Sequence, residues 1–236
     1  MFPPERMAAA GAEAGQVLAL TGVHAGAVLG LCCGPGRHAV EFARRGLAVT
    51  GGRPLSIPAR SRGNARRNGR RHRVGDGGHA AVPAHRAYHL ACNIFTSFGY
   101  FADEDDDLRV LRNVHESLNE GGVLVMELLG LERLARMWRD SWCEDYPDGT
   151  TIVRRPRLRD NWRRVANEWI LLKDGRARTF HFEHSLYPGR DLTNCLWRAG
   201  FAEVQLFGDL AGSVYGLDAR RLVAAARKTA ASRTCG

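Results

Sequence analysis

The sequence predicts an α/β fold: a doubly wound, mostly parallel seven-stranded sheet that ends in antiparallel strands. Three observations predict it. Short apolar runs alternate with stretches of helical spacing over roughly the first half of the chain. A glycine turn at 34–36 joins the first apolar run to a helix. From 150 to 187 the pattern becomes strand-like throughout, which indicates a small antiparallel β insertion. Together these features are typical of a Rossmann-like architecture.

The amino-terminal part reads as a helix followed by a βαβ unit. Residues 5–20 are alanine-rich and predict a helix, which two glycines weaken. Residues 28–32 and 47–50 predict two strands, and 37–45 the helix between them. Such a unit implies a parallel pair with a right-handed crossover. The apolar side of this helix is expected to carry Ala39, Val40, Phe42 and Ala43.

The middle of the chain supplies the central strands. Residues 60–71 are interpreted as a helix and 72–74 as a short strand, although this part has the least regular pattern. Residues 89–94 predict a central strand and 123–129 the next one. Between them, 105–118 has apolar residues at helical spacing and predicts a helix that ends at the following NEGG sequence. The apolar positions are Leu108, Leu111, Val114 and Leu118.

The carboxyl-terminal part changes character and then returns to the first pattern. Its predicted elements are strands at 150–157, 164–172 and 177–187, a helix at 191–199, and strands at 202–207 and 220–226. The KDGR sequence at 173–176 predicts a hairpin turn. The whole chain, 1–236, is therefore expected to form one domain with a β insertion at 150–187.

The composition excludes several classes of protein. Apolar residues make up 44% of the 236, so the chain can bury a core and a disordered chain is excluded. No apolar run reaches the length of a membrane helix, and the first residues lack the plan of a secretory signal. We therefore expect a cytoplasmic protein. The cysteines form no CxxC pair, which favours reduced thiols and no metal site; they are Cys32, Cys33, Cys92, Cys143, Cys195 and Cys235.

The charge is strongly positive, with a net charge of +9. Of 34 basic residues only Lys173 and Lys228 are lysine, which is typical of a GC-rich genome. The densest basic run, 60–73, suits RNA phosphates. No aromatic residue is interleaved with it, and stacking rings are what single-stranded recognition adds. The run is therefore interpreted as the solvated face of a helix and not as a nucleic-acid contact. The partner expected for the protein is a small-molecule substrate. The oligomeric state is not predicted.

The sequence VLGLCCGPGRHA at 28–39 places a glycine turn between a strand and a helix start. Backbone N–H groups and the positive end of a helix then meet at one spot, which suits an anion. The same residues match the dinucleotide pattern G-x-G-x-x-A. Arg53, near the end of the second strand, suits a 2′-phosphate. An NADP-binding oxidoreductase is therefore one alternative.

Several motifs in order resemble the class I S-adenosylmethionine (SAM)-dependent methyltransferases, specifically a small bacterial subfamily. They are VLGLCCGPGRHAVEFARRG, NIFTSFGYF at 93–101, LRVLRNVHESLNEGGVLVMELL, LYPGRDLTNCLWRAGF and RLVAAARK. The resemblance runs from about residue 4 to 228. It implies SAM as the cofactor and a small-molecule methyl acceptor, and it is more specific than a single glycine loop.

The resemblance also implies the site. The glycine loop would wrap the methionine part of SAM, Asp76 would lie by the adenine, and 94–101 would line the methyl-transfer pocket with four aromatic rings suited to a sulfonium. The rings are Phe95, Phe98, Tyr100 and Phe101. The implied cofactor-binding residues are Gly30, Cys32, Cys33, Gly34, Gly36, His38, Arg53, Asp76, Gly77, Asn93 and Phe95. Tyr100 is the candidate for facing the methyl group, and no catalytic residue is assigned. Candidate bases are His115, His181 and His184.

Three departures from the family concern acidic residues. Gly30 replaces the acid of the first motif, Arg53 stands where an acid binds the ribose, and His89 replaces a strand aspartate. A hydrogen bond to a charged group contributes about 1.5–3 kcal/mol. Each loss would thus weaken cofactor binding roughly ten- to a hundredfold. A catalytically impaired, methyltransferase-like binding protein is therefore the other alternative.

Overall fold

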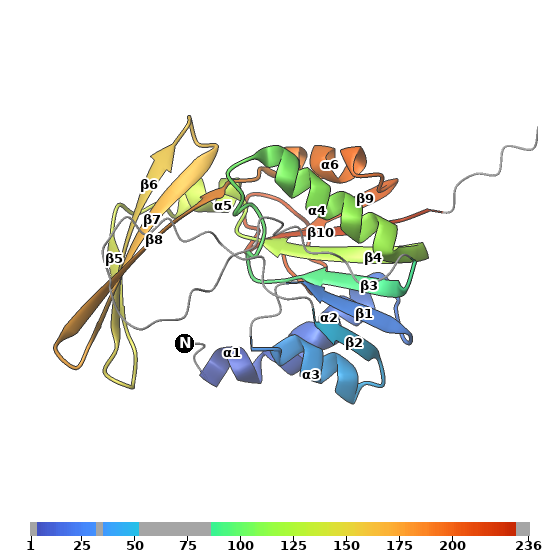
Figure 1. Ribbon diagram of the computed structural model, residues 1–236, viewed down its shortest axis with the longest axis horizontal. Helices are drawn as coiled ribbons and strands as arrows, with labels where there is room; N and C mark the ends of the chain where they lie inside the picture. The colour runs from blue at the N-terminus through green and yellow to red at the C-terminus, as the bar shows by residue number, and fades with distance from the viewer. Residues whose placement is uncertain (1–3, 32–34, 52–85, 230–236) are drawn as a thin grey trace, which may run out of the picture.

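The computed structural model describes residues 4–31, 35–51 and 86–229, and its main sheet has six strands in the order β2-β1-β3-β4-β10-β9 (Figure 1). Neighbouring strands from β2 to β4 run parallel, whereas β10 is antiparallel to both β4 and β9. The predicted doubly wound, mostly parallel sheet is confirmed. The strands are β1 (Ala27–Leu31), β2 (Ala48–Gly51), β3 (Tyr88–Asn93), β4 (Leu118–Leu128), β9 (Glu203–Phe207) and β10 (Leu222–Arg227).

Helices cover both faces of this sheet (Figure 1). On one face, α2 and α3 pack through a cluster that contains Val17 and Phe42. On the other face, α4 and α6 pack through a larger cluster that contains Leu111 and Leu196. The apolar spacing predicted for α4 is confirmed, since Leu108, Leu111 and Val114 are all buried. The fourth predicted position, Leu118, is also buried but is the first residue of β4. The helices are α1 (Pro4–Ala8), α2 (Ala10–Thr21), α3 (Arg37–Arg44), α4 (Glu104–Ser117), α5 (Leu131–Arg136) and α6 (Gly189–Arg198).

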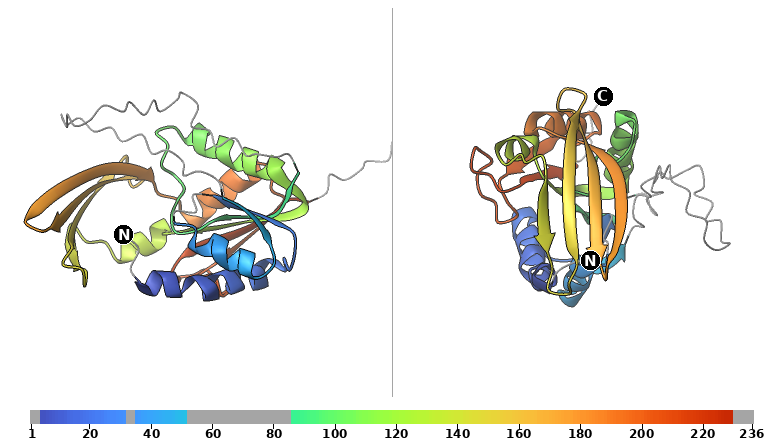
Figure 2. Two further views of the ribbon diagram at one scale, coloured as in Figure 1. Left: turned by 60° about the horizontal axis from the view of Figure 1, so that its bottom comes forward. Right: turned by 90° about the vertical axis from the view of Figure 1, so that its left-hand side faces the viewer.

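A second sheet of four antiparallel strands, in the order β5-β6-β7-β8, stands beside the main sheet (Figure 2). Its strands are β5 (Trp142–Asp145), β6 (Thr151–Arg159), β7 (Arg164–Lys173) and β8 (Arg176–Ser185). Asp174 and Gly175 turn β7 into β8 with φ values of 51° and 69°, as a two-residue type I′ hairpin requires. The predicted β insertion is thus present. It begins earlier than predicted, because β5 was not expected.

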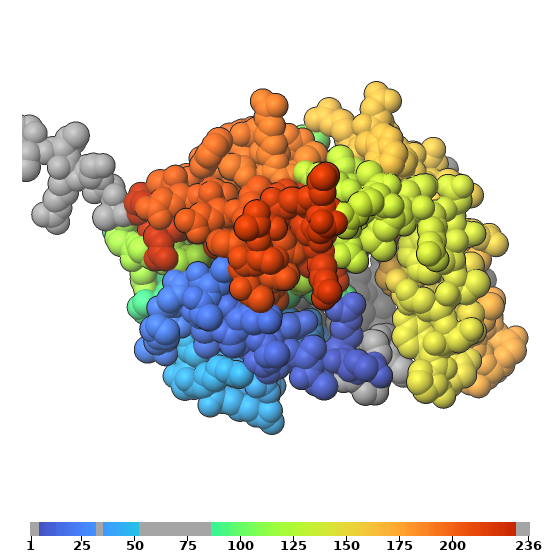
Figure 3. All heavy atoms as spheres, turned by 180° about the vertical axis from the view of Figure 1, so that it is seen from behind, coloured from blue at the N-terminus to red at the C-terminus, as the bar shows by residue number. Residues whose placement is uncertain are grey.

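Residues opposite each other in an antiparallel pair share a face of the sheet. The register places Arg154, Trp169 and Phe180 in one row and Pro156, Asn167 and Phe182 in the next. We call this the inner face, because Tyr100 of the main body contacts it at Phe182. From behind, the second sheet stands beside α1 and α2, and the red-orange segment that links β9 to β10 covers part of the main body (Figure 3).

The structure corrects several expectations. Helix α3 buries Phe42 and Arg37, whereas Val40 is 50% exposed and Ala43 is also exposed. The NEGG sequence is part of β4 rather than a linker, and its strand shifts register against β3. Helix α5 was not expected, and the first predicted helix breaks at Ala9 into α1 and α2.

The helix predicted at 60–71, the strand at 72–74 and the arginine run at 60–73 lie outside the described residues. Six of the seven predicted strands of the main sheet are therefore described. Among the described helices, none has the length and apolar character needed to cross a membrane.

Candidate functional site

The carboxyl ends of β1 and β3 lie side by side, with Leu31 paired to Asn93. The chain leaves these two strands in opposite directions along the sheet, because β1 leads to β2 on one side and β3 leads to β4 on the other. In open α/β sheets, ligands bind at such a switch point. Gly36, in left-handed conformation at φ 78°, precedes α3 and directs the start of that helix to this point. Asn93 is buried here, and its Oδ1 has no hydrogen-bond partner among the described residues.

A buried arginine opens α3. The side chain of Arg37 is 3% exposed. Its Nη1 donates to the carbonyl oxygen of Arg6 at 3.0 Å and to the carboxylate of Glu13 on α2. Its Nη2 is buried, and no residue in ranges 4–31, 35–51 and 86–229 forms a hydrogen bond with it. A buried charged group that lacks a hydrogen bond is costly. An anion at the switch point would satisfy this nitrogen.

Glu13 holds both Arg37 and His38. The His38 Nε2 lies 2.7 Å from the Glu13 Oε2. Burial raises the pKa of Glu13, but the hydrogen bonds from His38 and Arg37 outweigh it and leave the pKa below its ordinary value. Glu13 is therefore ionised at neutral pH and ties α2 to the start of α3. His38, which the sequence places at the cofactor, is engaged with α2 through this ring nitrogen.

The turn after β3 is strained and firmly held. Phe95 and Thr96 have φ values of 74° and 53°, a region that costs L-residues about 1 kcal/mol or more each. Glu127, at the end of β4, accepts the Phe95 N–H on its side chain at 3.0 Å and the Thr96 N–H on its carbonyl at 2.9 Å. Arg221 pairs with the same carboxylate at 3.3 Å. Glu127 thus fixes the turn that begins the predicted transfer segment.

Three guanidinium groups surround the ring of Phe95. The centroid lies 4.6 Å from the guanidinium carbon of Arg6, 5.7 Å from that of Arg37 and 5.8 Å from that of Arg221. This charge favours a carboxylate beside the ring and opposes a second cation. Glu13 pairs with Arg37 and Glu127 with Arg221, which leaves Arg6 as the guanidinium at this ring without an ion pair in the described part of the protein. That Phe95 faces a sulfonium stays a prediction, and Arg6 would favour an anionic part of the ligand there.

The other aromatic residues of the transfer segment divide into two groups. Phe98 is buried against Tyr187, at a centroid distance of 5.3 Å, and Phe101 packs against the main core. These two rings are structural. Tyr100 instead faces the second sheet, where its ring lies 5.2 Å from His184 and 6.2 Å from Phe182. Tyr100 therefore joins the transfer segment to the inner face.

Of the three candidate bases, only His184 lies beside Tyr100. Burial, together with the charge of Arg164, lowers the pKa of His184 to about 4, so its ring is neutral at neutral pH. His181 is exposed on the opposite face of β8. His115 lies in the last turn of α4, packed against Phe201 at the other edge of the sheet.

Of the remaining predicted positions, some lie in the strands of the main sheet and others lie outside the described residues. Gly30 lies in β1 between Gly51 and Cys92 of its neighbours. His89 lies near the start of β3, where its Nδ1 accepts the Ala27 N–H at 3.2 Å, so its replacement of an aspartate does not touch the switch point. Within the described ranges, no group of three or more metal-ligating side chains occurs. The predicted site residues outside the described ranges are Cys32, Cys33, Gly34, Arg53, Asp76 and Gly77.

Sequence reasoning missed Glu127, Arg6, Arg37 and Arg221. Glu127 is hidden in an apolar strand pattern, and a single acid there gives no distinct signal. The three arginines come from distant parts of the chain, and only the fold brings them to one ring.

No family model and no curated protein sequence matches this chain. Solved structures do match. The CcbJ methyltransferase from Streptomyces caelestis superposes with a TM-score of 0.70 at 19% identity, covering 97% of this chain and 91% of that one. The sugar N-methyltransferase KedS8 from Streptoalloteichus gives 0.59 at 20% identity, with coverage of 95% and 88%. SAM-bound CalS10, an amino pentose methyltransferase from Micromonospora echinaspora, gives 0.57 at 17% identity, with coverage of 94% and 91%. The chain has the fold of the class I SAM-dependent methyltransferases.

Proposed function

We propose that the protein is a SAM-dependent methyltransferase that acts on a small-molecule acceptor. The observation that carries the proposal is the unsatisfied, buried Nη2 of Arg37 at the switch point of a methyltransferase fold. SAM bears a carboxylate on its methionine part, and a guanidinium is a strong hydrogen-bonding partner for a carboxylate. The similar structures KedS8 and CalS10 act on a sugar and an amino pentose, which supports a small acceptor here.

The described residues fit the cofactor at two buried atoms. Arg37 would hold the carboxylate through Nη2, and Asn93 would accept a hydrogen bond from a polar group of SAM through Oδ1. When bound, SAM supplies a methyl group activated by a sulfonium. We further propose that Gly30, Gly36 and Phe95 line the same pocket. The glycine loop and the acid at Asp76 complete it in this proposal.

The residues of the chain contribute mainly alignment. Methyl transfer is an in-line displacement, so its rate depends on how well donor and acceptor are held in line. Glu127 fixes the strained turn at Phe95, and we propose that Tyr100 and the inner face of the second sheet orient the acceptor. A base is needed only for a protonated acceptor. With a pKa of about 4, His184 is a poor proton acceptor and is better suited to positioning.

Gly30 supports the alternative of a catalytically impaired, methyltransferase-like binding protein. Strand β1 has no acidic side chain near its carboxyl end, which lies at the switch point. The NADP alternative gains no support from the similar solved structures, which are methyltransferases. Both alternatives predict a different result from the following experiment.

The test is a calorimetric titration with SAM, with NADPH as the control ligand. We expect micromolar SAM binding in the wild type. Arg37→Gln should raise the Kd roughly ten- to a hundredfold, because it removes a charge-assisted hydrogen bond. Arg44→Gln is the matched control, since Arg44 lies on the same helix with a side chain that is 71% exposed, and its Kd should be unchanged.

Thermal melting of both variants would show whether Arg37→Gln still folds, since that arginine also pairs with Glu13. Absence of SAM binding up to millimolar concentration would contradict the proposal and support the impaired relative. Tight NADPH binding would support the oxidoreductase.

A further inference from the structure

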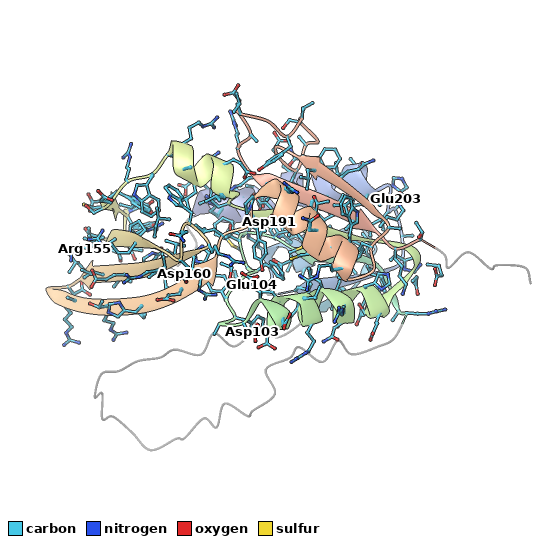
Figure 4. All side chains as sticks on the ribbon, turned by 90° about the horizontal axis from the view of Figure 1, so that it is seen from above. Asp103, Glu104, Arg155, Asp160, Asp191 and Glu203 are labelled. Carbon is cyan, nitrogen blue, oxygen red and sulfur yellow. The ribbon has the colours of Figure 1, made fainter. Side chains whose placement is uncertain are left out.

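A pocket of about 390 Å³ opens between the start of α4, one side of α6 and the connection from β6 to β7. Figure 4 shows Glu104, Asp160 and Asp191 coming from these three elements towards the same region. The pocket falls within the usual size range of small-molecule sites. The groups that give it chemical character are Glu104, Trp162, Arg163, Asp191, Asn194 and Arg198.

This pocket is separate from the proposed methyl-transfer site. Successive residues of a strand point to opposite faces. His184 of β8 faces Tyr100 on the inner face, whereas the next residue, Ser185, lines the pocket. The Ser185 N–H donates to the carbonyl oxygen of Gly99 at 2.7 Å. The pocket and Tyr100 therefore lie on opposite sides of the end of β8.

The charges in the pocket balance. Arg163 pairs with Glu104 at 3.3 Å. Asp191 and Arg198 both line the pocket from α6, and neither has an ion pair within the described part of the chain. They lie seven residues apart on this helix, about 10.5 Å along its axis. A ligand with a net charge gains little from a set of two acids and two bases.

An indole forms a flat wall beside these groups. Trp162 is 40% exposed, and its ring lies 5.9 Å from that of Trp138, which supports it from one side. Asn194 offers both a donor and an acceptor between Asp191 and Arg198. A hydroxyl group also donates and accepts, so a hydroxyl-bearing ligand satisfies the acid, the amide and the guanidinium alike. The apolar face of a sugar ring would cover the indole.

We propose that this pocket is a second binding site, which takes an uncharged, hydroxyl-rich ring such as a saccharide. The ring stacks on Trp162, and its hydroxyl groups bond with Asp191, Asn194 and Arg198. The proposal does not depend on SAM binding, because the pocket lies outside the switch point.

The test is a fluorescence titration of the full chain with maltose, in the absence of SAM. We expect a saturable change in the wild type, no such change in Trp162→Leu, and at least roughly tenfold weaker binding in Arg198→Ala, which loses a charge-assisted hydrogen bond. Two matched controls lie on α6 outside the pocket. Trp197→Leu removes an indole that is 56% exposed, and Arg190→Ala removes an exposed guanidinium; both should bind maltose like the wild type.

Circular dichroism of each variant would establish that it is folded. Saturation-transfer NMR with maltose gives a second measurement that does not rely on tryptophan emission. Absence of a saturable signal in the wild type would overturn the proposal. So would unchanged binding in Arg198→Ala, which would place the sugar elsewhere. Tighter, Arg198-dependent binding of a charged probe, citrate or spermidine, would overturn the assignment of an uncharged ligand.

Discussion

Replacing Asp107 by asparagine should stabilise the protein at neutral pH. Asp107 lies in the first turn of α4 and is completely buried. Its Oδ2 accepts a hydrogen bond from the hydroxyl of Tyr187 at 2.7 Å, and the backbone N–H of Gly99 also favours the charged carboxylate; no side chain in the described part of the protein bonds its Oδ1. Burial raises the pKa of this carboxyl from 3.8 to about 6, although the bond from Tyr187 opposes the shift. Above that pH, the ionised and buried Asp107 therefore lowers the free energy of unfolding.

The size and the sign of this effect on the free energy of unfolding follow from the difference between the pKa of Asp107 in the folded and in the unfolded protein. A carboxyl whose pKa rises on folding binds its proton more tightly in the folded state, so stability is lost as pH rises from 3.8 towards 6. A rise of the pKa from 3.8 to about 6 corresponds to a loss of stability of about 3 kcal/mol. Asp107→Asn keeps an acceptor for Tyr187 and carries no charge. We expect it to raise the free energy of unfolding by up to about 3 kcal/mol above pH 6, with little gain below pH 4.

The assay is urea unfolding of both proteins at a series of pH values between 4 and 8. Asp106→Asn is the matched control, because Asp106 lies in the same helical turn but is partly exposed and pairs with Arg109. Its charge interacts with the helix dipole in the same way. The two variants therefore differ in the burial of the carboxylate, apart from the surface ion pair of Asp106 with Arg109, which contributes less than about 1 kcal/mol. A loss of stability in Asp107→Asn at pH 8, or a gain that does not vary with pH, would refute the reasoning.

Three further predictions use the same unfolding and titration assays. Glu127→Gln should lower the free energy of unfolding by about 1.5–3 kcal/mol, because glutamine can still accept the Phe95 N–H but loses the charge that strengthens this bond and pairs with Arg221. Glu168→Gln, at a partly exposed pair, should cost less than about 1 kcal/mol. Lys228→Met should cost about 2–3 kcal/mol, since its Nζ bonds two carbonyls at the end of α4, and an unchanged midpoint would contradict this. Gly30→Asp combined with Arg53→Asp should tighten SAM binding roughly tenfold or more by calorimetry, and no gain would count against our placement of the cofactor.

The main sheet could be predicted from the sequence because its strands are short apolar runs between helices of clear periodicity. Leu108, Leu111 and Val114 show this best, since their spacing alone placed α4 on the core. The face of α3 that is buried could not be predicted from apolar spacing in the same way. Its partner α2 presents Glu13, so α3 buries Arg37 beside Phe42 and leaves the apolar Val40 in solvent.

The meeting of the ends of β1 and β3 could be predicted from the sequence, whereas the use of this point as a cofactor site stays a prediction. The glycine turn and Asn93 mark the ends of neighbouring strands, and strand order brings such ends together. The conformation at Phe95 and Thr96 depends instead on Glu127, which lies more than thirty residues later in an apolar strand. Long-range contacts of this kind leave no local pattern. The elements β5 and α5 were missed because WCED and LERLAR are too short to show a period.

The second sheet contributes no side chain to the two buried clusters that hold the helices on the main sheet. Substitutions on its inner face, at Trp169 or Phe182 for example, therefore change what faces Tyr100 without creating cavities in the main core. Most substitutions reduce stability, and selection removes those that bring a protein below the stability that its function needs. The second sheet can therefore change its surface while the main core stays intact, and under the proposed function such changes would alter which acceptor is bound.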